Sequence, residues 1–283
     1  MRAAIGRPYE WKTADSLLFF VFCVSLMQMM DLERGAPMEA FTMEIAGLVC
    51  RVQPLFISTR EYCRPYLTDK TPEFYVEVIR EDLAYEQKML DIEADAEGLK
   101  RRRFTDPFLE RASIQRKIAQ ALLKADTLLF HGSTVGVDGA AYLFTAPCGT
   151  GKSTHTRFWR EILGSRAVMV NDDKAFLKIT PHGVMAYGSP WTGKHGLGEN
   201  ISLPLKGICF LRRGTENRIW QAAPEAWVSE LQHQTVIPEG QQEKAFSLVD
   251  ALAQKVALWQ MECTKDPAAA AVSYAAMSGT GER

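Results

Sequence analysis

The chain has 283 residues, of which 47% are hydrophobic and 24% are charged, fractions that exclude a disordered or low-complexity protein. Lysine and arginine number 33 against 34 aspartates and glutamates, so the net charge of -1 gives no overall attraction to nucleic acid. The six cysteines are scattered without a C-x-x-C pair, which argues against a zinc site or a disulfide framework. We therefore expect a folded cytoplasmic protein.

Residues 1–40 differ in composition from the rest of the chain. Basic residues precede an uncharged run, residues 16–30, which Asp31 closes. As a helix, a run of this length rises only about 22 Å, less than the roughly 30 Å hydrocarbon core of a membrane. A peripheral helix on the body or an extension with little role in the fold is favoured over a membrane anchor. Membrane contact through this run stays open, whereas a signal peptide is not expected, because no small-residue cleavage site follows Met30.

Residues 41–124 predict a small N-terminal α+β portion packed on the core. Residues 43–52 and 74–79 are rich in β-branched and aromatic side chains, and each is predicted to be a strand. An acidic stretch, residues 81–97, is followed by a basic one, residues 100–103. Such opposite blocks favour a solvated surface loop over a phosphate or nucleic-acid patch.

A helix and a hairpin are predicted next. Ile114, Ile118 and Leu122 recur at helical spacing and indicate an amphipathic helix packed on the core. The Asp138-Gly139 pair stands between two apolar runs and predicts a β-hairpin, because a type I′ turn needs positive φ at both positions. In the common parallel P-loop folds a helical crossover enters the loop strand, so an antiparallel hairpin at this point bears on which P-loop fold is present.

Residues 146–154, with the sequence APCGTGKST, have the form of a phosphate-binding loop, although alanine opens it where the usual pattern has glycine. A strand is predicted over residues 140–144 and a helix over residues 154–163, as such a loop requires. Its backbone N–H groups and the helix N-terminus would face an anion. The alternative is a glycine-rich turn before an ordinary helix. The nucleotide-binding candidates are Gly149, Thr150, Gly151, Lys152, Ser153 and Thr154.

The remaining elements are predicted from short apolar runs. A polar, glycine-rich loop over residues 188–200 follows a predicted hairpin, and one long helix with an apolar face is predicted over residues 245–259. Asp266 is expected to cap a terminal helix that runs to Met277. Strands are predicted over residues 167–170, 176–179, 184–187, 206–212 and 217–221, the last two being the final strands expected.

Asp172 and Asp173, at the end of a predicted strand about 20 residues beyond the loop, fit the chemistry of phosphoryl transfer. One would hold Mg²⁺ together with Ser153, and the other would take the proton from an incoming hydroxyl. The alternative is a plain turn. Four further residues are candidates: His131 and Lys194 as catalytic residues, and His195 and Arg212 as substrate contacts. For each of them a purely structural role is the alternative.

The His131-Gly132-Ser133 segment, the Asp138-Gly139 hairpin, the loop at residues 149–154 and Asn171-Asp172-Asp173 together resemble the catalytic domain of HPr kinase/phosphorylase. The resemblance covers about residues 125–215, and residues 263–277 are similar to the tail of bacterial HPr-kinase-like proteins. It implies the α/β fold shared with phosphoenolpyruvate carboxykinase, with a mixed sheet flanked by helices. It further implies that Lys152 and Ser153 serve ATP and Mg²⁺, that the aspartates do acid/base work, and that His131 belongs to the site.

Three functions are compatible with these residues. The first is an ATP-dependent kinase, formed by residues 125–283, that phosphorylates a serine-like hydroxyl of a protein, a peptide or a small molecule. The second is a nucleotide-binding sensor or gating module with weak turnover, tethered to a membrane by residues 16–30. The third, a carboxykinase acting on a small carboxylate, would need a second metal site and an arginine cluster, which the sequence does not offer.

Overall fold

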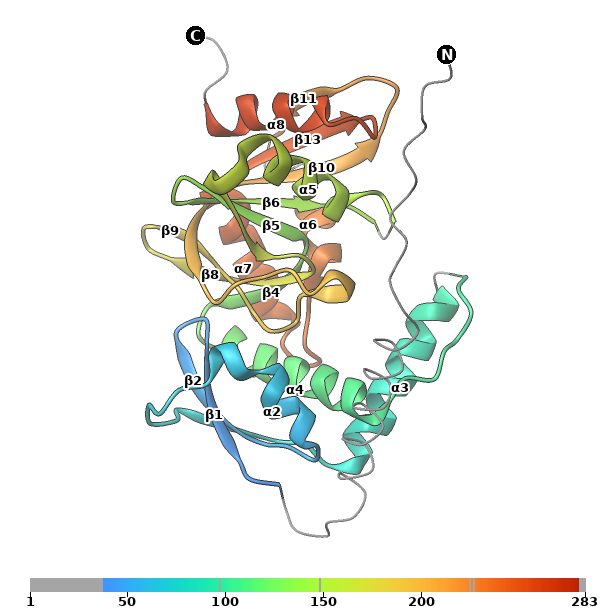
Figure 1. Ribbon diagram of the computed structural model, residues 1–283, viewed down its shortest axis with the longest axis vertical. Helices are drawn as coiled ribbons and strands as arrows, with labels where there is room; N and C mark the ends of the chain where they lie inside the picture. The colour runs from blue at the N-terminus through green and yellow to red at the C-terminus, as the bar shows by residue number, and fades with distance from the viewer. Residues whose placement is uncertain (1–37, 97, 148, 224, 226, 280–283) are drawn as a thin grey trace, which may run out of the picture.

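The computed structural model describes residues 38–279 except 97, 148, 224 and 226. The apolar run at residues 16–30 and its predicted helix or anchor lie outside this part. Within it, the fold is mixed α/β, with a three-stranded sheet at one end of the molecule and a larger mixed sheet at the other (Figure 1). No helix in the described ranges has the length and apolar character that crossing a membrane requires.

The small sheet contains β1 (Phe41–Ile45), β2 (Leu48–Gln53) and β3 (Phe74–Glu77), with β1 antiparallel and β3 parallel to β2. The prediction of one strand over residues 43–52 is wrong, because a turn at Ala46 and Gly47 divides it into a hairpin. Both turn residues have positive φ, 51° and 78°. The short helices α2 (Ile57–Tyr62) and η1 (Arg64–Tyr66) follow β2.

The acidic stretch is helix α3 (Arg80–Ala96), so the predicted surface loop is wrong. Two of its acidic side chains are paired with α4 (Asp106–Leu123), since Arg116 lies 2.6 Å from Glu86 and 3.3 Å from Asp82. The predicted amphipathic helix is confirmed as α4. Its buried side chains pack against the small sheet and also against β4 and β8 of the large sheet, which joins the two ends of the molecule.

The large sheet follows the order β12-β4-β8-β9-β10-β6-β5-β7, with β13 beside β10 and β11 beside β13. The Asp138-Gly139 hairpin is confirmed, with φ of 50° and 82° at the two turn positions. Strand β6 is antiparallel to β5 and parallel to β10, so the sheet is mixed as expected. The strand bounds are β4 (Thr127–His131), β5 (Ser133–Val137), β6 (Ala140–Thr145), β7 (Ala167–Asn171), β8 (Lys174–Thr180), β9 (Gly183–Tyr187), β10 (Ser202–Arg213), β11 (Arg218–Gln221), β12 (Thr235–Val236) and β13 (Ala257–Cys263).

The predicted long helix over residues 245–259 is wrong in its second half. Helix α7 (Gln242–Lys255) ends at Lys255, because the backbone of Val256 is extended (φ -126°, ψ 137°), and β13 follows at once. Strand β13 runs parallel to β10 and adds a strand that the sequence analysis did not anticipate. A short apolar run satisfies a helix and a buried strand equally well, because periodicity does not separate them.

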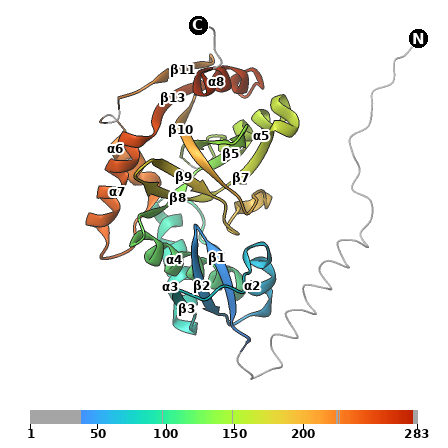
Figure 2. The same ribbon diagram turned by 90° about the vertical axis from the view of Figure 1, so that its left-hand side faces the viewer.

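Helices cover both faces of the large sheet (Figure 2). Helices α5 (Lys152–Leu163) and α8 (Ala268–Ser278) share one apolar cluster with β5, β6 and β13. Helices α6 (Val228–Gln234) and α7 pack with β4, β8 and β9 in another. The Asp266 carboxylate accepts the Ala268 N–H at 2.7 Å at the start of α8, as its predicted cap should.

His155 joins α5 to α8. Its side chain is 3% exposed and lies against the Phe144 ring, and its Nε2 is 2.8 Å from Ser273 Oγ. Trp159 Nε1 donates to the same hydroxyl at 2.8 Å. Burial lowers the pKa of His155 to about 4 from 6.5, so the imidazole is neutral at pH 7. Helix α5, which follows the loop at residues 146–151, is thus held in place by α8.

This pKa predicts a pH dependence of stability. Because the folded pKa lies below the unfolded one, the unfolded chain takes up a proton first, and His155 loses about 2 kcal/mol of its contribution to stability between pH 7 and pH 5. In His155→Gln the free energy of unfolding, measured with urea at several pH values, should fall less steeply over that interval than in the wild type. Identical pH slopes for the two proteins would contradict the assignment.

Candidate active site

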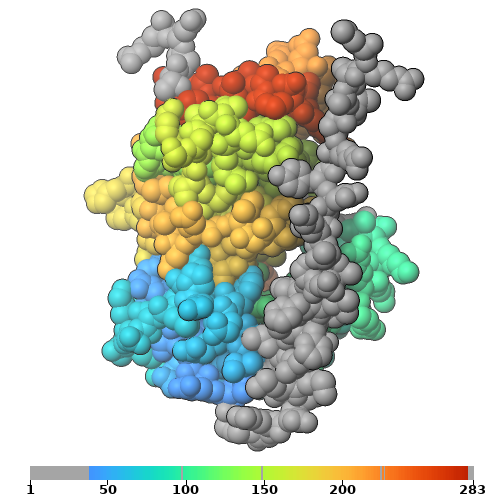
Figure 3. Space-filling model, viewed as in Figure 1, coloured from blue at the N-terminus to red at the C-terminus, as the bar shows by residue number. Residues whose placement is uncertain are grey.

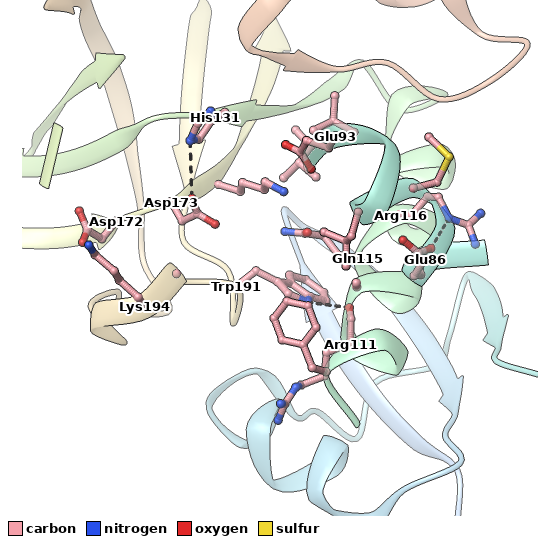
Figure 4. A pocket seen from close by; sticks show the side chains of 18 of the residues that line it. Glu86, Glu93, Arg111, Gln115, Arg116, His131, Asp172, Asp173, Trp191 and Lys194 are labelled. Carbon is pink, nitrogen blue, oxygen red and sulfur yellow. Dashed lines mark hydrogen bonds and ion pairs between the residues drawn. The ribbon is translucent and has the colours of Figure 1, made fainter. Parts of the chain in front are cut away.

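A cavity of about 1100 Å³ lies between the large sheet and helices α3 and α4 (Figure 4). It gathers most of the predicted site residues, although they are spread over β4, α5 and the loop before it, the β7–β8 turn, and the loop at residues 188–200. Thr150 and Arg212 are the predicted residues that do not line it. Those that do are His131, Gly149, Gly151, Lys152, Ser153, Thr154, Asp172, Asp173, Lys194 and His195.

The loop at residues 146–151, called the glycine-rich loop from here on, connects β6 to α5, as predicted. Gly149 and Gly151 have φ of 74° and 124°, a region that residues with a side chain rarely adopt, which explains why glycine occupies both positions. Lys152 is the first residue of α5, and its Nζ donates to the Ala146 carbonyl at 2.9 Å. Arg213 Nη2 donates to the Gly149 carbonyl at 2.7 Å and so ties the loop to the end of β10.

Asp172 is fixed to the helix that begins at Lys152. The carboxylate is 6% exposed, and Ser133 Oγ donates to its Oδ1 at 2.6 Å. The same Ser133 hydroxyl lies 2.8 Å from Thr156 Oγ1, one turn into α5. Neither Ser133 nor Thr156 was predicted as a site residue, and only the position of Ser133 beside His131 in the sequence was a signal.

Asn171 explains how two adjacent aspartates reach one cavity. Its Oδ1 accepts the backbone N–H of Asp173 at 2.9 Å and of Lys174 at 2.7 Å, which closes a tight turn between β7 and β8. Its Nδ2 donates to Ser189 Oγ at 2.9 Å and to the Trp191 carbonyl at 3.2 Å. Consecutive side chains of a regular strand would point in opposite directions, so the turn is what places both carboxylates at the cavity.

Asp173 is the more accessible carboxylate. Burial raises its pKa, while Lys174 and Lys152 oppose that effect. His131 Nε2 lies 3.7 Å from Asp173 Oδ1 (Figure 4), and burial, with the same two lysines, lowers the pKa of His131 to about 4. The imidazole is therefore neutral at pH 7, and the contact is not an ion pair there. Gly193 allows close packing, because a Cβ on it would lie 2.9 Å from Asp173 Cβ.

The other predicted cations lie at different depths. Lys194 and His195 are exposed in the short helix η3 (Gly193–His195) at the cavity edge. Arg212 lies away from the cavity, with its guanidinium 5.6 Å from the centre of the Trp227 ring and hydrogen-bonded to Gln260 when that amide is oriented to accept. Arg213, the next residue on the strand, points to the opposite side and contacts the loop.

The wall opposite the aspartates was missed by the sequence analysis. It is formed by α3 and α4, and the charge pattern of α3 predicts a loop where the structure has a helix. Its polar residues in the cavity include Glu86, Glu93, Gln115 and Arg116. No sequence signal marked these residues, because their position depends on the packing of two helices against a sheet that comes later in the chain.

Oxygen donors at the cavity suit Mg²⁺. The described residues contain no group of three or more histidine, cysteine, aspartate or glutamate side chains placed to hold a metal. Mg²⁺ usually takes only one or two carboxylates, with waters and substrate phosphates completing its coordination. The Ser153 hydroxyl and the Asp172 carboxylate, which both line the cavity, match that donor chemistry.

The sequence matches no protein-family model and no curated protein. Among solved structures, the chain is similar to the HPr(Ser) kinase/phosphatase from Coxiella burnetii, with 13% identity and a TM-score of 0.27 over 44% of this chain and 88% of that one. A likeness at this level carries no functional argument, so the function has to rest on the site itself.

Proposed function

We propose that the protein is a Mg²⁺-dependent phosphotransferase that moves the γ-phosphate of ATP to a serine-like hydroxyl of a protein, a peptide or a small molecule. The observation that carries this proposal is that a glycine-rich loop, its Lys152 and a pair of aspartates line one cavity. Residues 125–283 would form the nucleotide-binding domain, and residues 41–124 would supply the opposite wall. The expected cytoplasmic location belongs to the same proposal.

The loop would bind the triphosphate. Backbone N–H groups at the start of α5 and the positive end of that helix attract phosphate oxygens, and Lys152 adds a full charge. In the structure, Lys152 Nζ donates to the Ala146 carbonyl of its own loop. A bound phosphate, as a charged acceptor, would form a stronger hydrogen bond with Lys152 than that carbonyl does. Mg²⁺, held by Ser153 and Asp172, would neutralise charge on the β- and γ-phosphates.

The two aspartates would have separate roles. In the transfer, the acceptor hydroxyl oxygen forms a bond to the γ-phosphorus, the bond from that phosphorus to the β–γ bridging oxygen breaks, and ADP leaves with the electron pair. The hydroxyl proton goes to a carboxylate. Asp173 suits this role because it is accessible and its pKa is raised by burial, whereas the Asp172 carboxylate is already engaged by Ser133.

The alternative is a nucleotide sensor or gating module with weak ATP turnover. Such a protein needs the loop and a metal ligand, but it needs neither a second carboxylate nor a cavity that continues past the phosphates. Asp173 and the extension of the cavity to α3 and α4 favour transfer for this reason. A carboxykinase is disfavoured, because Arg116 in the cavity is already paired with Glu86.

The proposal is tested by incubating the wild-type protein with γ-labelled ATP, with and without MgCl₂. We expect saturable ATP binding and Mg²⁺-dependent release of label, to water when no acceptor is present and faster when one is added. ATP binding with only weak release of label to water, and no acceleration by any acceptor, would favour the sensor. No binding of ATP at millimolar concentration in titration calorimetry would refute both functions.

A further inference from the structure

The wall formed by α3 and α4 presents apolar side chains to the cavity. Tyr85 and Met89, one turn apart on α3, are 39% and 41% exposed, and Phe108 on α4 is 40% exposed. A single exposed apolar side chain is ordinary, but a group of large ones on one surface is typical of a binding site. Figure 3 shows the visible part of α3, in teal, at the side of the molecule. An apolar group of a ligand could therefore pack here while its reacting end faces the aspartates.

Gln115, on the cavity side of this wall, has a side-chain nitrogen that lacks a partner. Its side chain is 8% exposed and lines the cavity, and its Nε2 has no hydrogen-bond partner among the residues that the structure describes. Figure 4 shows Gln115 extending from α4 toward the side of the cavity that holds Asp173. A buried amide N–H without a partner costs about 1–3 kcal/mol, so native proteins rarely keep one unless a ligand or water completes it.

The wall brings equal numbers of acidic and basic side chains to the cavity, namely Glu86 and Glu93 with Arg111 and Arg116. Arg116 is paired with Glu86 and Asp82, and the Arg111 guanidinium lies 4.6 Å from the centre of the Tyr62 ring. On the opposite side, Lys152, Lys174 and Lys194 line the cavity beside the glycine-rich loop and the aspartates. The loop side is therefore suited to a polyanion and the helical wall to an uncharged ligand.

Building on the proposed function, we propose that this wall binds the phosphoacceptor and that Gln115 donates a hydrogen bond to a neutral carbonyl oxygen close to the acceptor hydroxyl. The acceptor class is then a hydroxyl compound with a neutral carbonyl and an apolar group, and without a carboxylate or phosphate near the hydroxyl. A serine within a peptide and a small hydroxylated amide share this chemistry. Gln115 acts as a specificity residue, distinct from the groups that move the phosphate.

The first test uses the wild-type protein, γ-labelled ATP and four acceptors at equal concentration. These are a heptapeptide with a central serine flanked by leucine and alanine, the same peptide with flanking aspartates, the benzylamide of N-acetylserine as a small neutral amide with an apolar group, and glyceric acid. We expect the initial rate of labelling to be at least tenfold higher for the neutral peptide or for the amide than for the two acidic acceptors. The peptide and amide arms distinguish the two sources of the carbonyl, and higher rates for the acidic acceptors would overturn the inference.

The second test removes the amide without changing the size of the side chain. For the preferred acceptor, Gln115→Met should raise KM about tenfold, the loss expected for one hydrogen bond, with little change in KM for ATP. Gln254→Met, the same substitution at an exposed position of α7 outside the cavity lining, should leave both constants unchanged.

The experiments distinguish a failure of this inference from a failure of the proposed function. An unchanged acceptor KM in a folded Gln115→Met protein would overturn the inference while leaving the kinase assignment intact. If Gln115→Met does not fold, the order of rates among the four acceptors with wild-type protein still decides the question. Absence of ATP binding by the wild type would remove the proposed function, and this inference with it.

Discussion

Replacing Lys152 with alanine should weaken ATP binding at least a hundredfold while leaving the fold intact. Lys152 begins α5 within the glycine-rich loop, where its ammonium can form charge-assisted hydrogen bonds with phosphate oxygens. In the structure its Nζ donates to the Ala146 carbonyl, on a part-buried segment at the cavity. Alanine is also a better helix former than lysine, so the start of α5 should persist.

The measurement is titration calorimetry with ATP and MgCl₂, accompanied by a thermal unfolding curve for each protein. Lys255→Ala is the matched control, because Lys255 is exposed at the end of α7 and its Nζ donates to the Pro181 carbonyl, outside the cavity lining. The control should bind ATP as the wild type does. Normal ATP affinity in Lys152→Ala would show that the loop is a structural turn and would remove the basis for a kinase.

Changing Asp173 to asparagine should lower the rate of phosphate transfer by about 10²–10⁴, the range typical for loss of a general base, and leave ATP affinity within a few-fold of the wild type. Asparagine has the same shape and keeps the backbone N–H that Asn171 accepts, so the β7–β8 turn should survive. The carboxamide cannot take the hydroxyl proton at neutral pH. Turnover, not binding, is the quantity that should change.

Label transfer under saturating ATP measures this effect. Asp126→Asn is a suitable control, because Asp126 is a surface carboxylate paired with Lys244, outside the cavity lining. Asp172→Asn offers a contrast, since it should raise the Mg²⁺ concentration needed for half-maximal rate. If Asp173→Asn retains full turnover while Asp172→Asn alone loses it, the assignment of the two carboxylates is reversed.

The parts of the fold that could be predicted from the sequence are those in which a few neighbouring residues determine the backbone conformation and long-range packing does not change it. The Asp138-Gly139 turn and the loop before α5 depend on backbone conformations that only a few residue types adopt, so their residues alone indicate them. Helix α3 was not predicted because two of its acidic side chains, Asp82 and Glu86, are paired with α4, which a count of charges along the chain does not reveal. Strand β13 was not predicted because its apolar run is equally compatible with a helix.

The residues of the candidate site likewise divide into those that nearby sequence indicates and those that only long-range packing brings to the cavity. Lys152, Asp172 and Asp173 were predicted from spacing to a loop whose form is itself distinctive. Arg212 is the predicted substrate contact, but Arg213 is the residue that contacts the loop. Successive side chains of a strand point to opposite faces, and the sequence does not say which face the loop occupies. Gln115 lies on a helix that reaches the cavity through long-range packing, so nothing near it in the sequence could have indicated its position.

The contact between His155 and Ser273 has a consequence for the order of events during synthesis. Helix α5, which carries Lys152, is secured by a helix that begins more than a hundred residues later, at Ala268. On the ribosome, the loop and both aspartates emerge long before the segment that immobilises them. The emerging polypeptide should therefore expose the α5 surface that α8 later covers, and it should acquire high affinity for nucleotide only after residues 268–278 have left the exit tunnel.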